Sequence, residues 1–146
     1  MSKLCAMRMI TLFLLPAVAV GCATSAKGPS DAEQVGALLG VWKAGILAKD
    51  VNKIMSTYSE AFSHDGYEYD AESKAALREY IEGSIDEGNF DDVEVEIESA
   101  DITIDGSNAN IYPIDFSTYQ GTVSIELIAT QEKGGWRFTD MMIEGL

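Results

Sequence analysis

With 146 residues the chain can form one domain but is too short for two, and its 24 acidic against 10 basic residues give it a formal charge of −14. The imbalance is also local, because no Lys or Arg lies between Glu79 and Glu132. A body of this charge repels nucleic acid and anionic lipid surfaces, so we expect no nucleic-acid partner. Such a surface is typical of a solvated domain, with a cationic partner or loosely bound divalent cations as the alternative.

The first 21 residues have the pattern of a secretory signal peptide. Lys3 and Arg8 supply positive charge, and residues 10–20 form an almost wholly apolar run. That run is shorter than the roughly 20 apolar residues that a membrane-spanning helix needs. Small residues then lead to Cys22. This order predicts a signal peptide over residues 1–21 that is removed from the mature chain.

The run Ala19-Val20-Gly21-Cys22 resembles the lipobox of bacterial lipoproteins, whose cysteine is acylated and becomes the new N-terminus. It departs from the usual box at Ala19, where Leu is more common. The resemblance implies that acylated Cys22 is held in the lipid bilayer and that residues 22–30 form a tether. It implies a bacterial cell envelope location, and Ala23 fits the periplasmic side of the outer membrane if the host is Gram-negative.

Cysteine and histidine are too scarce for several kinds of site. Cys5 leaves with the signal peptide, so Cys22 is the single cysteine of the mature chain, and we expect no disulfide and no cysteine nucleophile. One histidine and scattered carboxylates predict no metal site, because a metal needs several converging ligands. We also expect no cofactor.

A long amphipathic helix opens the domain of residues 31–146. Ser30 and Glu33 have the spacing of a capping box, and apolar residues then recur at helical spacing, which predicts a helix over residues 31–48. Gly36 and Gly40 share one face of this helix, so we expect another element to pack closely there.

Shorter elements follow. Asp50 is a candidate N-cap for a helix that ends near Tyr58, and Ser73 is one for a helix over residues 74–83. Between them, residues 62–69 predict a strand or a hairpin arm, and residues 85–90 predict a loop.

The rest of the chain predicts four consecutive strands with tight turns. Apolar and polar residues alternate through residues 93–104, then 109–118, then around Val123, Ile125 and Leu127, and finally over residues 136–143. Strands joined by tight turns form an antiparallel meander, and here helices precede it. The predicted fold class is therefore α+β.

The order of these elements resembles the nuclear-transport-factor-2-like superfamily, which includes ketosteroid isomerases and polyketide cyclases of the SnoaL type. The local matches are residues 49–54 leading to 58–62, then residues 73–80 and 134–138. The resemblance implies a bent antiparallel sheet whose concave face holds the N-terminal helices, forming a cone with an apolar pocket. It also implies a homodimer through the outer face of the sheet, as is frequent in this superfamily.

The resemblance does not carry the isomerase chemistry with it. Trp42 stands where those enzymes have a catalytic tyrosine, Gly66 where they have the basic aspartate, and Leu127 near the position of their protonated aspartate. An indole lacks an acidic hydroxyl, and a leucine cannot donate a proton. Unless Asp65 moves into register, the resemblance implies that this chemistry is absent.

Three other side chains are weak catalytic candidates. His64 next to Asp65 suggests a general base, but neighbouring residues of a strand point to opposite faces, so the two cannot simply pair. Asp115 lies in an apolar strand and can face the pocket, or a bulge at Pro113 can turn it outward. The residues leave both orientations open.

Aromatic side chains suit the wall of an apolar pocket, and the alternative is that they simply fill the core. The residues expected to line the pocket are Trp42, Tyr58, Phe62, Tyr80, Tyr112 and Trp136.

These observations support a first reading and two alternatives. The first is a membrane-anchored domain that binds a small apolar ligand or a protein partner without catalysis. One alternative is an isomerase, cyclase or dehydratase that uses Asp65, His64 or Asp115. The other is a structural module that dimerises through its sheet.

Overall fold

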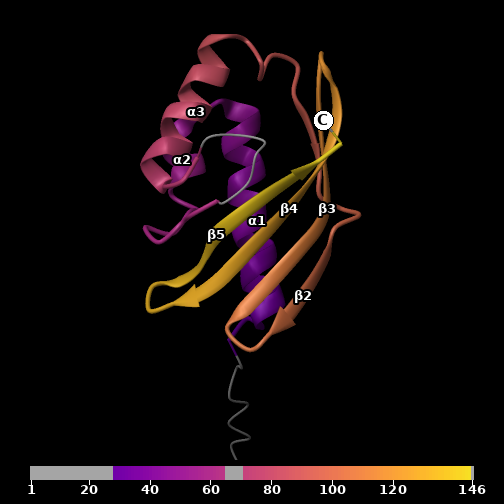
Figure 1. Ribbon diagram of the computed structural model, residues 1–146. Coiled ribbons are helices and arrows are strands. Elements are labelled where there is room, and N and C mark those ends of the chain that lie inside the picture. Colours follow the sequence, from indigo (N-terminus) through magenta and orange to yellow (C-terminus); the bar gives the residue numbers. More distant parts are fainter. Residues whose placement is uncertain (1–27, 65–70, 146) are drawn as a thin grey trace, which may run out of the picture.

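Helix α1 (Asp31–Ala48) lies along the concave face of a curved antiparallel sheet in the computed structural model, which describes residues 28–64 and 71–145 (Figure 1). The predicted capping box is present: Ser30 Oγ accepts the Glu33 N–H, and the Glu33 carboxylate accepts the Ser30 N–H at 2.7 Å. The helix ends where Lys49 adopts a left-handed conformation, with φ of 53°.

Two shorter helices pack at the C-terminal end of α1. They are α2 (Val51–Met55) and α3 (Lys74–Asp86), and Asp50 and Ser73 cap them as predicted. Helix α2 ends earlier than predicted because the next residues bond to the sheet instead. The Thr57 carbonyl accepts the Phe138 N–H at 2.9 Å, and a backbone turned toward a strand cannot continue a helix.

The segment 57–63 lies along the outer edge of the last strand. Tyr58 forms a parallel bridge with Phe138, and the Ser63 N–H donates to the Thr139 carbonyl at 3.2 Å. This segment covers an edge that would otherwise present unpaired backbone groups. The predicted strand over residues 62–69 is not found in its described part, and residues 65–69 lie outside the described residues.

The sheet contains a meander of β3 (Asn108–Thr118), β4 (Gly121–Glu132) and β5 (Gly135–Glu144), as predicted. The prediction of one continuous strand over residues 93–104 is wrong. Two strands, β1 (Glu94–Glu96) and β2 (Asp101–Asp105), pair with different halves of β3. They are separated by a turn in which the Ala100 N–H donates to the Ile97 carbonyl at 3.1 Å.

Two bulges change which side chains face the concave side. On β3 an extra residue separates Ile111, paired with Leu127, from Ile114, paired with Ile125. On β5 the extra residue is Thr139. Bulges bend strands and increase twist, and they shift the inward–outward alternation by one residue. The result is an α+β fold with a curved sheet around α1, which confirms the predicted fold class.

The hydrophobic core lies between one face of α1 and the concave face of the sheet. Val35, Leu39, Trp42 and Ile46 are buried at helical spacing on α1. The sheet contributes buried residues from β1 and from the meander, namely Val95, Ala109, Ile111, Ile114, Ile125, Leu127, Ala129, Trp136, Phe138 and Met141.

Gly45 is where α1 and α2 approach most closely. A Cβ atom at Gly45 would lie 2.9 Å from Ile54 Cγ1 and 3.0 Å from the Ile54 backbone nitrogen. A Cβ atom at Gly40 would meet nothing within 4 Å, and one at Gly36 would make an ordinary contact of 3.8 Å with Ile102. The expectation that Gly40 marks a close approach is therefore wrong, and Gly45 is the residue that packing requires.

We predict that Gly45→Ala lowers the free energy of unfolding by about 1–3 kcal/mol, because the new methyl group would push against the Ile54 backbone. The matched variant Gly40→Ala should raise it by about 0.5–1 kcal/mol, because only helix propensity changes there. Urea unfolding measures both. Equal stability of the two variants would contradict the packing role of Gly45.

Candidate functional site

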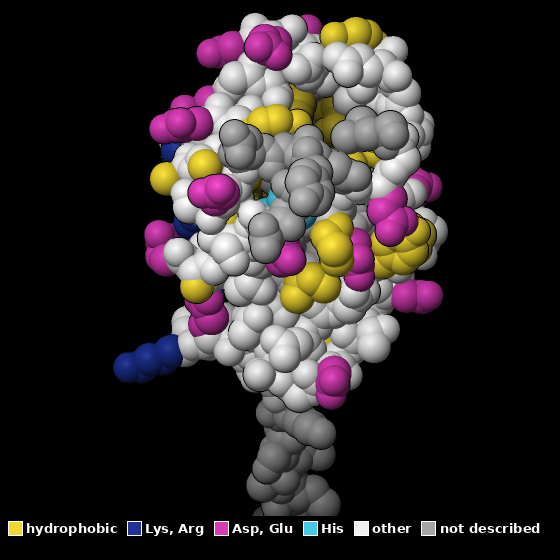
Figure 2. Space-filling model, in the orientation of Figure 1, with side chains coloured by type: hydrophobic (Ala, Val, Ile, Leu, Met, Phe, Trp, Pro, Cys, Tyr) yellow, Lys and Arg dark blue, Asp and Glu magenta, His cyan; other side chains and the backbone are white. Residues whose placement is uncertain are grey.

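A cavity of about 370 Å³ opens between α3, the C-terminal half of α1 and the end of the sheet that carries the β3–β4 turn. Figure 2 shows hydrophobic side chains recessed in a hollow on this upper part of the molecule. The volume lies within the range of small-molecule pockets. The lining residues are Trp42, Ile46, Tyr58, Tyr80, Ile81, Ser84, Asn89, Phe90, Phe116, Thr118, Gln120, Gly121, Thr122, Val123, Ile125, Met141, Ile143 and Gly145.

The deep wall of the cavity consists of a buried hydrogen-bonded chain. The Trp42 Nε1–H donates to the Tyr58 hydroxyl at 3.0 Å, and that hydroxyl donates to Met141 Sδ at 3.5 Å. All three side chains are buried, and burial raises the pKa of Tyr58 well above its usual range. The polar atoms of this wall therefore satisfy one another, and the wall presents a neutral, largely apolar surface.

Two polar residues of the cavity, Asn89 and Gln120, meet at its rim, and a third, Ser84, is buried on α3. Asn89 lies in the loop after α3, and Gln120 lies in the β3–β4 turn. Asn89 Oδ1 accepts from Gln120 Nε2 at 3.0 Å and from the Tyr119 hydroxyl at 3.3 Å. Gln120 Nε2 also lies 2.8 Å from the Tyr119 hydroxyl. We call Asn89, Tyr119 and Gln120 the rim clasp, because they join the two walls.

The described lining of the cavity carries no Asp, Glu, His, Lys or Arg. General acid–base catalysis needs a titratable group within hydrogen-bond reach of the reacting atom. The described walls can hold an apolar body through aromatic and aliphatic contacts and can orient a polar end at the rim. The titratable side chains of the described lining are the tyrosines Tyr58 and Tyr80.

Of the aromatic residues expected at the pocket, Trp42, Tyr58 and Tyr80 line the cavity. The other three lie elsewhere. Phe62 packs edge-on against Tyr58, with ring centroids 5.1 Å apart, on the side away from the cavity. Trp136 lies at the other end of α1, where its Nε1–H donates to Asp31 at 3.3 Å.

Tyr112 points away from the cavity because of the β3 bulge. It is 38% exposed, and its hydroxyl donates to Glu144 at 3.1 Å. The hydrogen bond to the Glu144 carboxylate and its negative charge raise the pKa of Tyr112. Tyr112 therefore belongs to the outer face of the sheet.

The three weak catalytic candidates are not brought together at the cavity. Asp115 lies on the outer face, where it accepts a hydrogen bond from Ser124 at 3.2 Å, so the bulge turns it outward. His64 Nδ1 lies 3.0 Å from Asp140 Oδ1, and its side chain is only 7% exposed. Neither His64 nor Asp115 is among the cavity-lining residues. Asp65 and Gly66 lie outside the described residues.

Sequence reasoning missed several lining residues. Phe116 and Met141 each follow a bulge, which shifts the inward–outward alternation by one residue. A simple alternation along each strand therefore assigns them to the outer face, although both line the cavity. Phe90 was predicted only as part of a loop, yet its ring packs edge-on against Phe116 with centroids 5.6 Å apart. The position of Phe90, an apolar aromatic residue at the end of a polar loop, could have indicated that its side chain is buried.

The outer face of the sheet differs sharply from the concave face. A row across four strands places Glu96 opposite Asp115, Asp115 opposite Ser124, and Ser124 opposite Glu144. Like charges directly opposite one another on a sheet are destabilising. Glu126 on the same face accepts a hydrogen bond from Asn110. The outer face is therefore strongly acidic.

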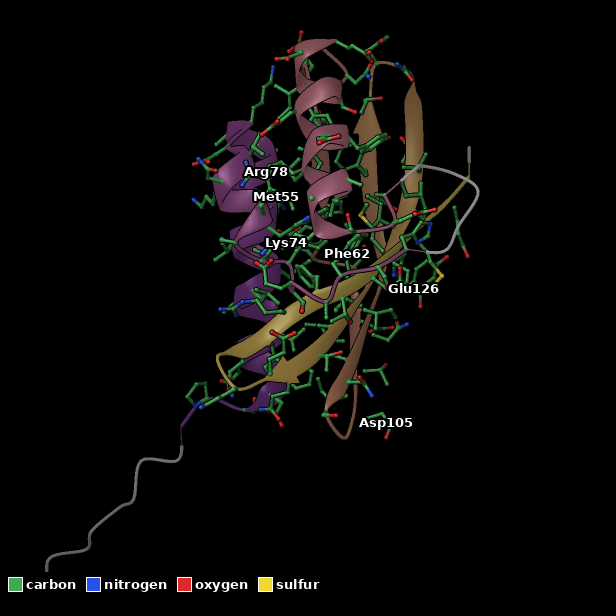
Figure 3. All side chains as sticks on the ribbon, turned by 60° about the vertical axis from the view of Figure 1, so that its left-hand side comes forward. Met55, Phe62, Lys74, Arg78, Asp105 and Glu126 are labelled. Carbon is green, nitrogen blue, oxygen red and sulfur yellow. The ribbon has the colours of Figure 1, made fainter. Side chains whose placement is uncertain are left out.

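A second, open depression lies where α2 meets α3, close to the Met55, Lys74 and Arg78 that Figure 3 labels. Its two cations already have partners. Lys74 Nζ lies 2.6 Å from Glu60, and Arg78 donates to Glu82 and to Asn52. We assign no anion site there.

Within residues 28–64 and 71–145, no group of three or more His, Cys, Asp or Glu side chains could hold a metal ion. None of the helices in this part of the chain is long and apolar enough to cross a membrane.

The fold matches solved structures, although the sequence itself gives no match. No protein-family model matches the chain, and no curated protein matches it. A protein of unknown function with a cystatin-like fold from Nostoc punctiforme has a TM-score of 0.63 and 15% identity, covering 75% of this chain and 86% of that one. An NTF2-like protein from Novosphingobium aromaticivorans has the same TM-score and 15% identity, covering 77% and 80%.

A third structure, from Streptomyces avermitilis, is described as a candidate dehydratase of the NTF2-like family. It has a TM-score of 0.61 and 10% identity, covering 77% of this chain and 94% of that one. The class that these comparisons define is the cystatin-like, nuclear-transport-factor-2-like fold. At such low identity the likeness establishes the fold and nothing finer.

We predict that Tyr58 makes the domain sensitive to alkali. The folded-state pKa of Tyr58 is raised, so its contribution to stability is complete below the unfolded-state pKa of about 10 and is lost as the pH rises beyond that value. Tyr58→Phe should therefore lose less stability than the wild type between pH 9 and 11, as urea unfolding would measure. At pH 7 the variant should be less stable by about 1–3 kcal/mol, because the Trp42 N–H loses its partner. Identical pH profiles would contradict this role.

Proposed function

We propose that this domain binds a small apolar or amphipathic molecule in the cavity, without catalysing a reaction, and that acylated Cys22 anchors it in the membrane of the bacterial cell envelope. The observation that carries the binding proposal is the lining: aromatic and aliphatic side chains around about 370 Å³, with no charged residue among the described ones. The fold and the order of elements also support membership of the NTF2-like superfamily.

A small molecule suits the cavity better than a protein partner does. The deep wall of Trp42, Tyr58 and Met141 is buried, and a protein surface would reach it only through an inserted side chain or chain end. A compact ligand can replace cavity water there and contact the aromatic rings directly. The cavity therefore favours the ligand reading over the protein-partner reading.

The enzyme alternative has less support. Asp115 faces the outer side of the sheet, and His64 pairs with Asp140 away from the cavity lining. An isomerase, cyclase or dehydratase would therefore depend on Asp65, which the structure does not describe. The dehydratase description of the Streptomyces avermitilis neighbour extends to this chain only through the shared fold.

The dimer alternative faces an electrostatic cost. Pairing two outer sheet faces would bring Glu96, Asp115, Glu126 and Glu144 of each copy toward those of the other. Like charges brought together at an interface are unfavourable unless cations or basic groups separate them. A homodimer through this face is thus less favoured than a monomer that binds a ligand.

For membrane anchoring, the sequence run that ends at Cys22 is the support. We predict that Cys22→Ser moves the protein from the membrane fraction to the soluble fraction, because the acyl chains lose their attachment site. Cys5→Ser is the matched control, since Cys5 leaves with the signal peptide, and it should stay with the membrane. Cell fractionation followed by immunoblotting reads out both. Membrane association of the Cys22→Ser protein would refute lipidation at this residue.

For ligand binding, we predict that the full chain binds the neutral apolar dye N-phenyl-1-naphthylamine. Val123→Trp should raise the dissociation constant about tenfold or more, because the indole would occupy cavity space beside the half-buried Val123. Fluorescence titration measures the affinity, and native mass spectrometry of protein from its own host would identify the resident molecule.

The matched control is Val41→Trp, which places the same side chain on the exposed face of α1 and should leave the affinity unchanged. If Val123→Trp does not fold, Ser84→Phe supplies a second cavity-filling variant at another wall. Equal affinity of the wild type and a folded cavity-filling variant would contradict binding in this cavity.

A further inference from the structure

The cavity has a polarity gradient that selects among ligands. Its deep wall satisfies its own polar atoms through the Trp42–Tyr58–Met141 chain, so a ligand group placed there gains nothing by being polar. Apart from Ser84 on α3, the cavity's other polar side chains lie toward the rim, where the loop after α3 meets the β3–β4 turn. A ligand that matches both parts has an apolar body and one polar end.

The hydrogen bonds of the rim clasp determine which kind of polar end fits. Gln120 Nε2 donates to Asn89 Oδ1 and contacts the Tyr119 hydroxyl, and Asn89 Nδ2 donates to Glu87 Oε2 at 3.2 Å. Both N–H donors of Gln120 and one of the two N–H donors of Asn89 are therefore engaged within the protein. Asn89 Oδ1 already accepts two hydrogen bonds, so the amide oxygen left to accept from a ligand is that of Gln120, together with hydroxyl groups, which can accept or donate.

The absence of positive charge among the described residues of the cavity also disfavours an anionic ligand. The described cavity lining holds no Lys or Arg, and Glu87 accepts a hydrogen bond from Asn89. Lys49 contacts the same loop, but it is already paired with Asp91. A carboxylate, sulfonate or phosphate brought to the rim would lose its hydration without gaining a cation from the described lining. An uncharged hydroxyl or N–H has no such penalty and finds acceptors.

We propose that the cavity takes an uncharged amphiphile that carries a hydrogen-bond-donating end, and that it discriminates against organic anions of the same shape. This inference rests on the proposed ligand-binding function and adds the class of ligand. The apolar body lies against Trp42, Phe90 and Phe116, and the donating end lies at the amide oxygen of Gln120.

Two dyes of the same skeleton test the proposal. N-phenyl-1-naphthylamine is neutral and has one N–H, and 1-anilinonaphthalene-8-sulfonate adds a sulfonate to that skeleton. Fluorescence titrations on the full chain, near physiological salt so that distant charges are screened, give both affinities. Any signal that remains in Val123→Trp is subtracted as background. We expect the neutral dye to bind at least about tenfold more tightly, because the sulfonate would be desolvated without a partner.

A cation placed at the rim should change this preference. Thr122→Lys adds a positive charge to an exposed lining residue and should reduce the ratio of the two affinities about tenfold. Thr103→Lys is the matched control, since Thr103 is exposed on β2 outside the cavity lining and the same substitution changes the net charge equally. The control should keep the wild-type ratio.

The outcomes separate the two proposals. If the sulfonated dye binds the wild type as tightly as the neutral dye does, the discrimination is refuted while ligand binding stands. If Thr122→Lys and Thr103→Lys change the ratio equally, the rim is not the source of the selectivity and the proposal fails. If neither dye binds above the Val123→Trp background, ligand binding itself is refuted, and the ligand class with it.

Discussion

The hydrogen bond from Trp42 to Tyr58 joins parts of the chain that lie far apart in sequence and meet in the core. Trp42 comes from the middle of α1, Tyr58 from the segment after α2, and Met141 accepts from Tyr58 on the last strand. An indole N–H and a phenol buried together would be costly without each other. Because they are paired, large aromatic rings can sit deep in the fold, and the cavity above them keeps a neutral wall.

The sheet separates two electrostatic environments. Its concave side and α3 enclose an uncharged cavity, and its convex side carries carboxylates in adjacent register positions such as Glu96 and Asp115. The bulge on β3 maintains this separation, because it returns Ile114 and Phe116 to the concave side and turns Asp115 out. The excess of acidic residues in the composition is thus placed where water can solvate it.

The helices and the meander could be predicted from local signals, since caps, apolar periodicity and turn residues act over a few positions. The positions of individual side chains at the candidate site could not be predicted in this way. Which face Tyr112 and Asp115 occupy depends on one extra residue in β3, whose effect no alternation count resolves. Trp136 and Trp42 look equally suitable for a pocket in sequence, but Trp136 lies at the N-terminal end of α1 and Trp42 lines the cavity farther along the helix. His64 pairs with Asp140 across a tertiary contact that no local pattern encodes.

The pairing of residues 57–63 with the edge of β5 bears on how readily the protein aggregates. Residues 57–63 shield the backbone of Phe138 and Thr139, and the same segment supplies Tyr58 to the cavity wall. A molecule bound against Tyr58 stabilises this segment by mass action, and its release makes opening of the segment easier. An emptied protein therefore exposes a strand edge more often, and edges are where chains pair with one another. If a ligand binds as proposed, its supply and the protein's resistance to aggregation are linked through residues 57–63.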